Sequence, residues 1–207
     1  GATVCLMILV NNGAGKHIYA TLQHSKWNGM TPCDLVFPFF LFIMGISTYL
    51  SLKKTNFTWS RQVAFKIVKR TVLLFFIGLF INWFDMAISG NALDLSHLRI
   101  WAVMQRIAIC YFAVSIFALC CNHRHTIPAI VILLAAYSLL LIWGNGYAYD
   151  SQQNILAQID IRLFGIEHLY HNSPVDPEGT GSSLSAIAHT LIGFYCGKRM
   201  SDAKSTE

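Results

Sequence analysis

The chain has 207 residues, of which 55% are hydrophobic and only 12% are charged, with a net charge of +5 at neutral pH. Ordinary soluble domains carry about 25% charged residues, so the composition argues against this class. A basic chain can bind nucleic acid, but here the lysines and arginines cluster where a membrane protein keeps its cytoplasmic loops. We therefore expect no nucleic-acid partner.

Six cysteines lie in or beside apolar runs, and none of them has CxxC or metal-ligand spacing. We interpret them as small buried hydrophobic residues, so neither a disulfide framework nor a metal site is expected. They are Cys5, Cys33, Cys110, Cys120, Cys121 and Cys196.

Uncharged apolar runs occupy residues 35–52, 71–84, 107–122 and 126–149. The first and last reach the roughly 18 residues that indicate a transmembrane helix. The sequence therefore predicts an all-α fold, a polytopic transmembrane helix bundle of about six helices. In chain order these are residues 2–10, 33–52, 62–84, 100–121, 127–143 and 183–197. The first is too short to span a bilayer and is expected to be part of a longer helix, and Pro38 is expected to kink the second.

Lysine and arginine are unequally divided between the two ends of these helices. The segments 52–70 and 122–126 and the C-terminal tail hold ten of them, whereas the opposite loops hold four. By the positive-inside rule the ten-charge side is cytoplasmic, so loops 11–32, 85–99 and 144–182 face outward. We expect one transmembrane domain over residues 1–200 and a polar cytoplasmic tail over residues 201–207.

Several polar side chains are expected at one depth in the outer half of the membrane. Arg106 and His189 each lie six residues into a predicted helix from its outward end, or about 9 Å. Asp34 lies near such an end, and Gln105 adjoins Arg106. Two interpretations of Arg106 remain open: it pairs with Asp34 or Asp85, or it orients a substrate in an outward polar cavity. For His189 alone, a hydrogen bond between helices is favoured.

The outward loops supply further candidates. His24 lies close to the membrane, where an imidazole can accept a proton or an acyl group, although spacing alone favours an ordinary surface histidine. Asp176 and Glu178 are spaced to form an acid–base pair, but a turn with helix N-terminal charges explains the same spacing and is favoured. The basic residues within 53–70 could hold the phosphates of a cytosolic cofactor, with positive-inside charge near anionic lipid as the favoured alternative.

Three ordered blocks of sequence resemble the heparan-α-glucosaminide N-acetyltransferase family and its bacterial homologues. They are VNNGAGKHIYATLQHSKWNGMTPCDLVFPFFLFIMGIS at residues 10–47, LRIWAVMQRIAICY at residues 98–111 and VDPEGTGSSLSAIAHTLIG at residues 175–193. The resemblance covers nearly the whole chain. Family members are longer, with about ten or eleven spans, so it implies that this chain is roughly the first half of a transmembrane acyltransferase.

The resemblance implies transfer of an acetyl group from cytosolic acetyl-CoA to an amino sugar or glycan on the non-cytoplasmic side, without a metal. His24 corresponds to the histidine of the family's HxxWNG motif, which is either acetylated itself or deprotonates the amine. Asn11 corresponds to the asparagine that begins its NxGGG motif and helps to position the reacting groups. The bacterial inner membrane is the expected location, or an organelle membrane in a eukaryote. Candidates for substrate or cofactor binding are Asp34, Gln105, Arg106, Asp176, Glu178 and His189.

Two other classes of function fit the same residues. A sugar or glycan transporter or permease also places polar residues at half-membrane depth and interrupts a helix with proline, but it would not consume acetyl-CoA. A non-catalytic membrane subunit is the third reading, and binding of acetyl-CoA by the chain would argue against it. The expected partners are the lipid bilayer, acetyl-CoA and the acceptor, and the sequence is also compatible with a homodimer.

Overall fold

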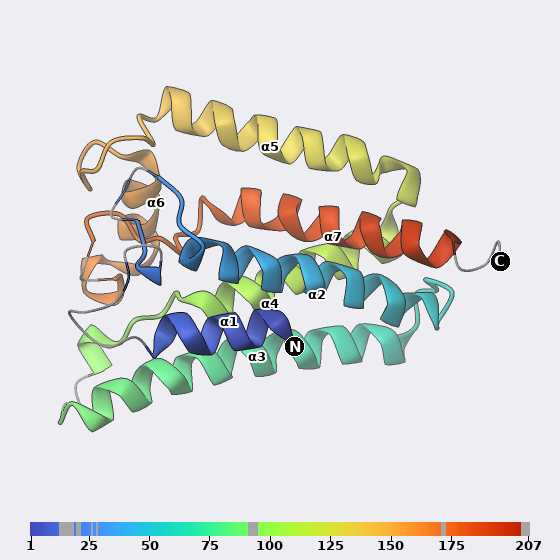
Figure 1. Ribbon diagram of the computed structural model, residues 1–207, viewed down its shortest axis with the longest axis horizontal. Coiled ribbons are helices and arrows are strands. Elements are labelled where there is room, and N and C mark those ends of the chain that lie inside the picture. Colours follow the sequence, from blue (N-terminus) through green and yellow to red (C-terminus); the bar gives the residue numbers. More distant parts are fainter. Residues whose placement is uncertain are drawn as a thin grey trace.

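The structure is a computed structural model that describes residues 1–12, 19, 22–25, 27, 29–90, 95–170 and 173–203. This part of the chain forms seven α-helices, and no strand occurs among the described residues (Figure 1). A 3-10 turn over Cys33–Leu35 leads directly into the second helix. The predicted all-α bundle is confirmed. The helices are α1 (Ala2–Asn11), α2 (Val36–Lys53), α3 (Arg61–Ile88), α4 (Val103–Cys120), α5 (Thr126–Trp143), α6 (Ile155–Phe164) and α7 (Ser183–Ala203).

Four helical segments are long and apolar enough to cross a membrane, namely Cys33–Lys53, Arg61–Ile88, Val103–Cys120 and His123–Trp143. The helices α3 and α5 bury few of their residues, and large side chains such as Phe65, Phe76 and Ile132 are exposed on them. Exposed apolar faces of this length suit lipid rather than water. The chain is a multi-pass integral membrane protein.

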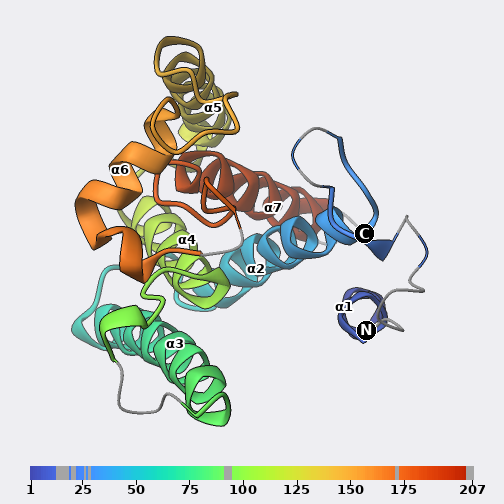
Figure 2. The ribbon, with the colours of Figure 1, turned by 90° about the vertical axis from the view of Figure 1, so that its left-hand side faces the viewer.

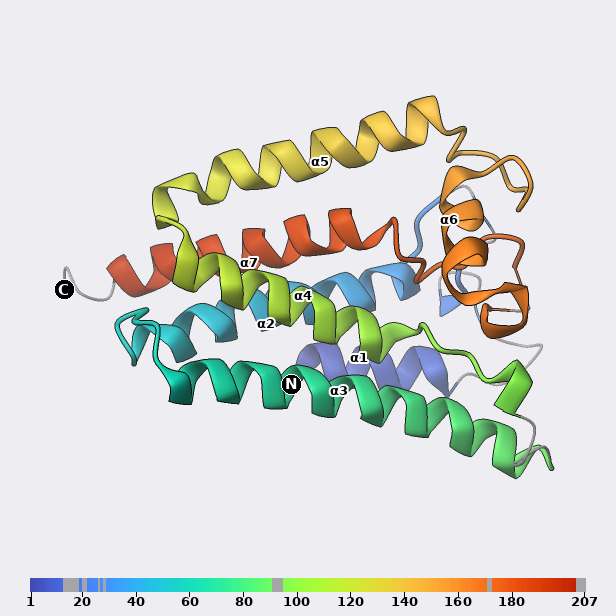
Figure 3. The same cartoon turned by 180° about the vertical axis from the view of Figure 1, so that it is seen from behind.

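The helix α7 lies at the centre of the bundle, where it packs against α2, α4 and α5 (Figure 2). Its buried residues are mostly small, and they include Ser183, Ala186, Ala188, Thr190 and Gly193. Seen from behind, α4 runs between α7 and α3, and α3 packs against α4 (Figure 3). The short helix α1 lies at the edge of the bundle, against α2.

Glycines let the backbones of α2 and α7 approach each other closely. A Cβ atom on Gly45 would lie 2.1 Å from the carbonyl oxygen of Thr190, and one on Gly193 would lie 2.1 Å from that of Phe42. Gly197 lies one turn further along the same face of α7. Small residues four apart allow this kind of close contact between helices in membranes, so α2 and α7 form a tightly joined pair.

The loops gather at two ends as the charge pattern predicts. One end holds the α2–α3 connection and the end of α7, where Lys53 donates a hydrogen bond to Ser201. The other end, here named the outer end, holds α6 and the first residues of α2, α4 and α7 (Figure 1). Of the basic residues counted above, Lys16, Lys26 and Lys204 lie outside the described residues.

Several boundaries differ from the sequence prediction. The helix α3 continues to Ile88, and α7 continues to Ala203, into the segment that was expected to be a polar tail. Pro38 lies in the first turn of α2, where a missing N–H removes no helical hydrogen bond. The expected kink therefore has no cause at that position.

The helix α6 was not predicted. It is a ten-residue amphipathic helix in the outer loop, and it runs across the outer end of the bundle (Figure 2). The Asn154 side chain caps its start by accepting from the Leu156 N–H at 2.8 Å, and Gly165, with φ of 79°, ends it. Ten residues with alternating polar and apolar character do not produce the long apolar run on which the prediction relied.

Candidate active site

The outer end of α2 carries a histidine–carboxylate pair. Nδ1 of His24 lies 2.6 Å from Oδ1 of Asp34. The His24 side chain is 71% exposed, whereas the Asp34 side chain is only 24% exposed. In the tautomer that donates from Nδ1, the other ring nitrogen is free to accept a proton. The pair thus has the arrangement of a general base that is oriented by a carboxylate.

Local hydrogen bonds fix the position of Asp34. Its Oδ2 accepts from the backbone N–H of Thr31 at 2.9 Å, from the Thr31 hydroxyl at 3.0 Å and from the backbone N–H of Ser25 at 3.3 Å. One carboxylate oxygen therefore organises the loop, while the other faces His24. The 3-10 turn provides this placement, because the Asp34 N–H bonds back to the Thr31 carbonyl at 3.0 Å.

Trp27 anchors the same loop to the segment between α5 and α6. Its indole N–H donates to the carbonyl oxygen of Tyr147 at 2.9 Å, and its ring lies 4.8 Å from that of Tyr149 between centroids. Catalytic groups on loops act only when the surrounding structure holds them in position. The Trp27 contacts supply such a support for His24, three residues away.

Cys33 lies against the imidazole of His24. Its Sγ is 3.4 Å from Nε2 and 3.6 Å from Nδ1, and the residue is only 3% exposed. The sequence interpretation treated every cysteine as a buried hydrophobic residue, which is wrong for Cys5, Cys120 and Cys121, because they are exposed. It also overlooked the neighbourhood of Cys33, although Cys33 directly precedes a candidate carboxylate.

A cavity of about 300 Å³ opens between α2, α4, α5 and α7. Arg106 and His189 both line it, so the structure brings together two residues that were expected at equal depth. Phe37 and Pro38 lie one helical turn along from Cys33 and Asp34, so the cavity begins about one turn inward from the His24–Asp34 pair. The remaining lining residues are Leu41, Leu134, Ser185, Ala186 and Ile192.

Arg106 is 7% exposed and contacts the turn before α7. Its Nη2 donates to the carbonyl oxygen of Gly179 at 2.9 Å and to the hydroxyl of Ser182. Within the described part of the chain, neither Asp34 nor Asp85 forms an ion pair with it. Its hydrogen bonds join α4 to the turn before α7, and its side chain also lines the cavity.

Two buried nitrogens at this cavity lack a hydrogen-bond partner among the described residues, Nε of Arg106 and Nε2 of His189. The hydrogen bond between helices that was expected for His189 is therefore not made by its Nε2. Buried polar atoms without partners are costly unless a ligand or water satisfies them. Both residues line the cavity, although these two nitrogens themselves have almost no exposed surface.

Gln105 faces away from this cavity. Its Nε2 lies 3.4 Å from the carbonyl oxygen of Phe75 on α3, and the side chain packs against Gly78. Adjacent residues on a helix do not share a face. Gln105 therefore joins α4 to α3, whereas Arg106 points toward α7.

Asp176 and Glu178 are both held by Arg99, a residue that the sequence did not single out. Nη2 of Arg99 lies 2.7 Å from a carboxylate oxygen of each. The carbonyl of Asp176 closes a turn by accepting from the Gly179 N–H at 3.0 Å, and its Oδ2 accepts from the Tyr170 N–H at 3.1 Å. These contacts support the interpretation of this segment as a turn. Because Arg99 pairs with both carboxylates, neither is placed to act as a free acid or base.

Asp160 on α6 is a buried carboxyl group that the sequence did not identify. Its Oδ1 accepts from the Thr180 N–H at 2.7 Å, while its Oδ2 has no hydrogen-bond partner among the described residues. Burial raises the pKa of Asp160 above its ordinary value, and the charge of Asp176 adds to this rise, although Thr180 and Arg106 oppose it. Asp160 and Arg106 thus hold the Gly179–Thr180 segment from two sides.

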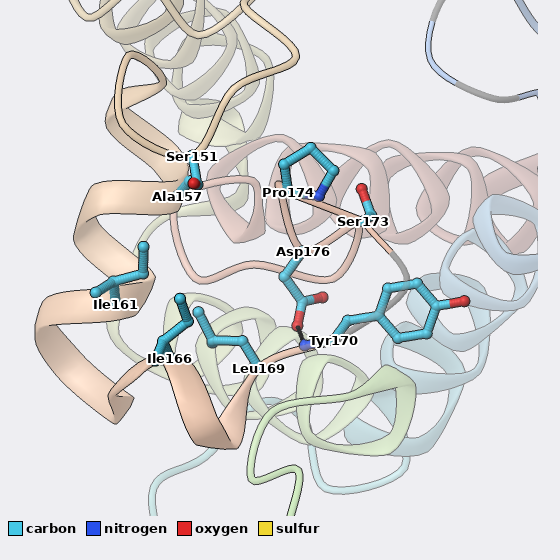
Figure 4. A pocket seen from close by; sticks show the side chains of 9 residues that line it. All are labelled: Ser151, Ala157, Ile161, Ile166, Leu169, Tyr170, Ser173, Pro174 and Asp176. Atoms are coloured by element: carbon cyan, nitrogen blue, oxygen red, sulfur yellow. Dashed lines mark hydrogen bonds between the residues drawn. The ribbon is translucent and has the colours of Figure 1, made fainter.

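A second cavity, of about 350 Å³, lies at the outer end between α6 and the loop before α7. Figure 4 shows Ile161, Ile166 and Leu169 on one side of it, and the Asp176 carboxylate bonded to the backbone nitrogen of Tyr170. Its lining is mainly apolar, and its one carboxylate is already paired with Arg99. Among the described residues, no group of three or more His, Cys, Asp or Glu is arranged to hold a metal ion.

Comparison with known proteins gives the chain its relatives. Residues 19–89 match a family described as a domain of unknown function, DUF5009. The chain is 39% identical to the heparan-alpha-glucosaminide N-acetyltransferase of Mus musculus and 28% identical to that of Homo sapiens. Each match covers 96% of this chain and 37% of the relative, so the chain spans little more than a third of the length of these relatives.

Proposed function

We propose that this chain, which belongs to the heparan-α-glucosaminide N-acetyltransferase family, carries the acceptor side of an acetyl transfer in the membrane. The observation that supports this most directly is the His24–Asp34 pair, with 2.6 Å between Nδ1 and Oδ1. It provides an exposed, oriented base at the end of a membrane-length helix. The proposed donor is acetyl-CoA, and the proposed acceptor is the amine of an amino sugar or glycan.

The chemistry needs a base because an amine is protonated at neutral pH and cannot attack a carbonyl in that form. His24 accepts the proton on Nε2, and Asp34 stabilises the resulting imidazolium through Nδ1. The thioester of the donor is already activated. The acceptor is therefore the partner whose activation the protein must supply.

The tetrahedral intermediate carries a negative charge on the acetyl oxygen and needs a hydrogen-bond donor. Arg106 is one candidate, because it is a cationic hydrogen-bond donor whose side chain lines the cavity. Asn11, the last residue of α1, is the other, and it lies exposed at the same end of the bundle. Asp34 orients His24, and His189 lines the same cavity as Arg106.

By the positive-inside rule, the outer end with His24 faces away from the cytoplasm. A cytosolic donor then reaches His24 through the membrane part of the protein, and the cavity beside Phe37, of about 300 Å³, is the space that we assign to the acetyl end of the donor. We propose the bacterial inner membrane as the location, with the acceptor on its non-cytoplasmic side.

The test is acetyl transfer from labelled acetyl-CoA to glucosamine by the full-length protein in membranes. His24→Gln should lower the rate by about 100-fold or more, with membrane insertion unchanged. His125→Gln, at an exposed histidine of the opposite end, is the matched control and should keep the parental rate. Parental turnover by His24→Gln would refute the role of His24, and uptake of labelled glucosamine without acetyl transfer would indicate a transporter.

A further inference from the structure

We propose that Cys33 is a second catalytic residue, a thiol that carries the acetyl group between donor and acceptor. This inference rests on the proposed acetyl transfer and names the residue that performs its covalent step. It is carried by a cluster of three groups: Sγ of Cys33 is 3.4 Å from Nε2 of His24, whose Nδ1 is 2.6 Å from Oδ1 of Asp34. A nucleophile beside a base that a third group orients is the diagnostic arrangement for covalent catalysis.

The tautomer of His24 decides which nitrogen serves the thiol. The short contact to Asp34 keeps the proton on Nδ1, so Nε2 is the atom that accepts the thiol proton. Sγ lies at similar distances from both ring nitrogens, 3.4 Å and 3.6 Å, and so it is not yet in line with Nε2. The reaction therefore requires the ring or the thiol to shift, and such contacts commonly tighten only when substrate is bound.

Burial separates the roles of the two residues. Cys33 is 3% exposed, whereas the His24 side chain is 71% exposed. An acetyl group on the thiol is shielded from water, while one on the imidazole would face the solvent and hydrolyse. The thiol also begins the membrane-length segment Cys33–Lys53, and Phe37, one turn along, lines the cavity that we assign to the donor. Cys33 therefore contacts the exposed base and lies one helical turn from a residue that lines the donor space.

The two half-reactions balance without any further reactant. In the first, the Cys33 thiol gives its proton to Nε2 of His24, its sulfur bonds to the acetyl carbon, and the bond from that carbon to the coenzyme sulfur breaks. The coenzyme leaves as a thiol with the proton returned by His24. In the second, the acceptor amine attacks the Cys33 thioester, His24 takes the amine proton and delivers it to the departing Cys33 sulfur, and an amide is formed.

Thioester exchange leaves the energy of the acyl bond nearly unchanged, because one thiol replaces another. The acetyl group therefore stays activated for the amine, which an ester on a hydroxyl side chain would not achieve. One base serves both half-reactions, so a single histidine is sufficient.

The experiment incubates the full-length protein with labelled acetyl-CoA in the absence of an amine, followed by denaturation and peptide mass spectrometry. We expect the acetyl group on Cys33 and its release by neutral hydroxylamine, which cleaves thioesters. Cys33→Ala should lack the adduct and lose about 100-fold or more of the transfer rate. Cys110→Ala, which changes another buried cysteine, is the matched control. It should keep both the acetyl adduct on Cys33 and the parental transfer rate.

A second measurement covers the case in which Cys33→Ala does not fold. In the parental protein, prior incubation with acetyl-CoA should protect Cys33 from alkylation, whereas Cys5 and Cys120 remain reactive. Label on His24 alone, or parental transfer by a folded Cys33→Ala variant, would overturn the carrier role while leaving the acetyl transfer intact. Absence of both label and transfer in the parental protein would overturn the two proposals together.

Discussion

Nη2 of Arg106 lies 2.9 Å from the carbonyl oxygen of Gly179 and joins the first turn of α4 to the turn before α7. Arg106→Gln should remove this bond and the bond to the Ser182 hydroxyl, although the Gly179 carbonyl keeps the bond from Ser182 at 2.8 Å. The expected cost is about 1–3 kcal/mol of stability, because hydrogen bonds from a charged group are stronger than neutral ones. A lower thermal unfolding midpoint in detergent would show this loss. Arg162→Gln, at an exposed arginine of α6, should change the midpoint little. Equal midpoints for the two variants would contradict the role of the Gly179 contact.

Asp34→Asn should reduce acetyl transfer by about 10²-fold or more while the protein still inserts in the membrane. An amide cannot stabilise the imidazolium, and it can stabilise the wrong tautomer of His24. The measurement is the rate of labelled acetyl transfer to glucosamine. Asp85→Asn makes the same change at an exposed position on α3 and should be silent. If Asp34→Asn transferred acetyl groups at the parental rate, Asp34 would have no role in the reaction.

Gly193→Val should destabilise the bundle, because its Cβ would meet the carbonyl oxygen of Phe42 at 2.1 Å. The two helices must then separate, and overpacking of this kind costs about 1–3 kcal/mol or more. Thermal unfolding followed by circular dichroism measures the loss. Ala136→Val, on an exposed part of α5, adds a similar side chain where there is room. The prediction fails if both variants unfold at the same temperature.

Asp160→Asn should make stability less dependent on pH. Because burial raises the pKa of Asp160 in the folded protein, the folded state holds this proton more tightly than the unfolded chain. The associated stability is fully present below the unfolded pKa and is lost as the pH rises through the folded pKa. The asparagine stays neutral, so the variant should lose less stability than the parent as the pH rises above about 4, the ordinary pKa of an aspartate.

Thermal unfolding midpoints across that range test the prediction for Asp160. Asp150→Asn, a less buried carboxyl in the same outer loop, serves as the control and should follow the parent. A variant curve parallel to the parental curve would show that Asp160 does not titrate as its burial indicates.

The spans could be predicted because lipid imposes a long apolar run on each of them. The equal depth expected for Arg106 and His189 came from helical rise alone, whereas their placement around one cavity depends on how the helices are rotated. The orientation of Gln105 was within reach of the same reasoning, since neighbours on a helix face different directions. What the sequence could not supply was contact between loop residues distant along the chain, such as Arg99 with Asp176, because no periodicity relates them.

His24 shows the same limit at closer range. Its motif marked it as a candidate, but its two neighbours, Asp34 and Cys33, depend on a 3-10 turn and on hydrogen bonds from Thr31 and Ser25. Hydrophobic periodicity does not predict backbone geometry of this kind. The short amphipathic helix α6 was missed by the sequence prediction for a related reason: its apolar face is buried by the outer loops and not by lipid.

The glycine contacts between α2 and α7 bear on the proposed transfer of an acetyl group across the bilayer. Alternating-access carriers open and close by rocking one group of helices against another. Here the backbones interlock at Gly45 and Gly193, so sliding one helix along the other would drive side-chain carbons into main-chain atoms. Sliding of α2 along α7 is therefore disfavoured. Under the proposed function, the acetyl group would move past these two helices while they keep their relative position.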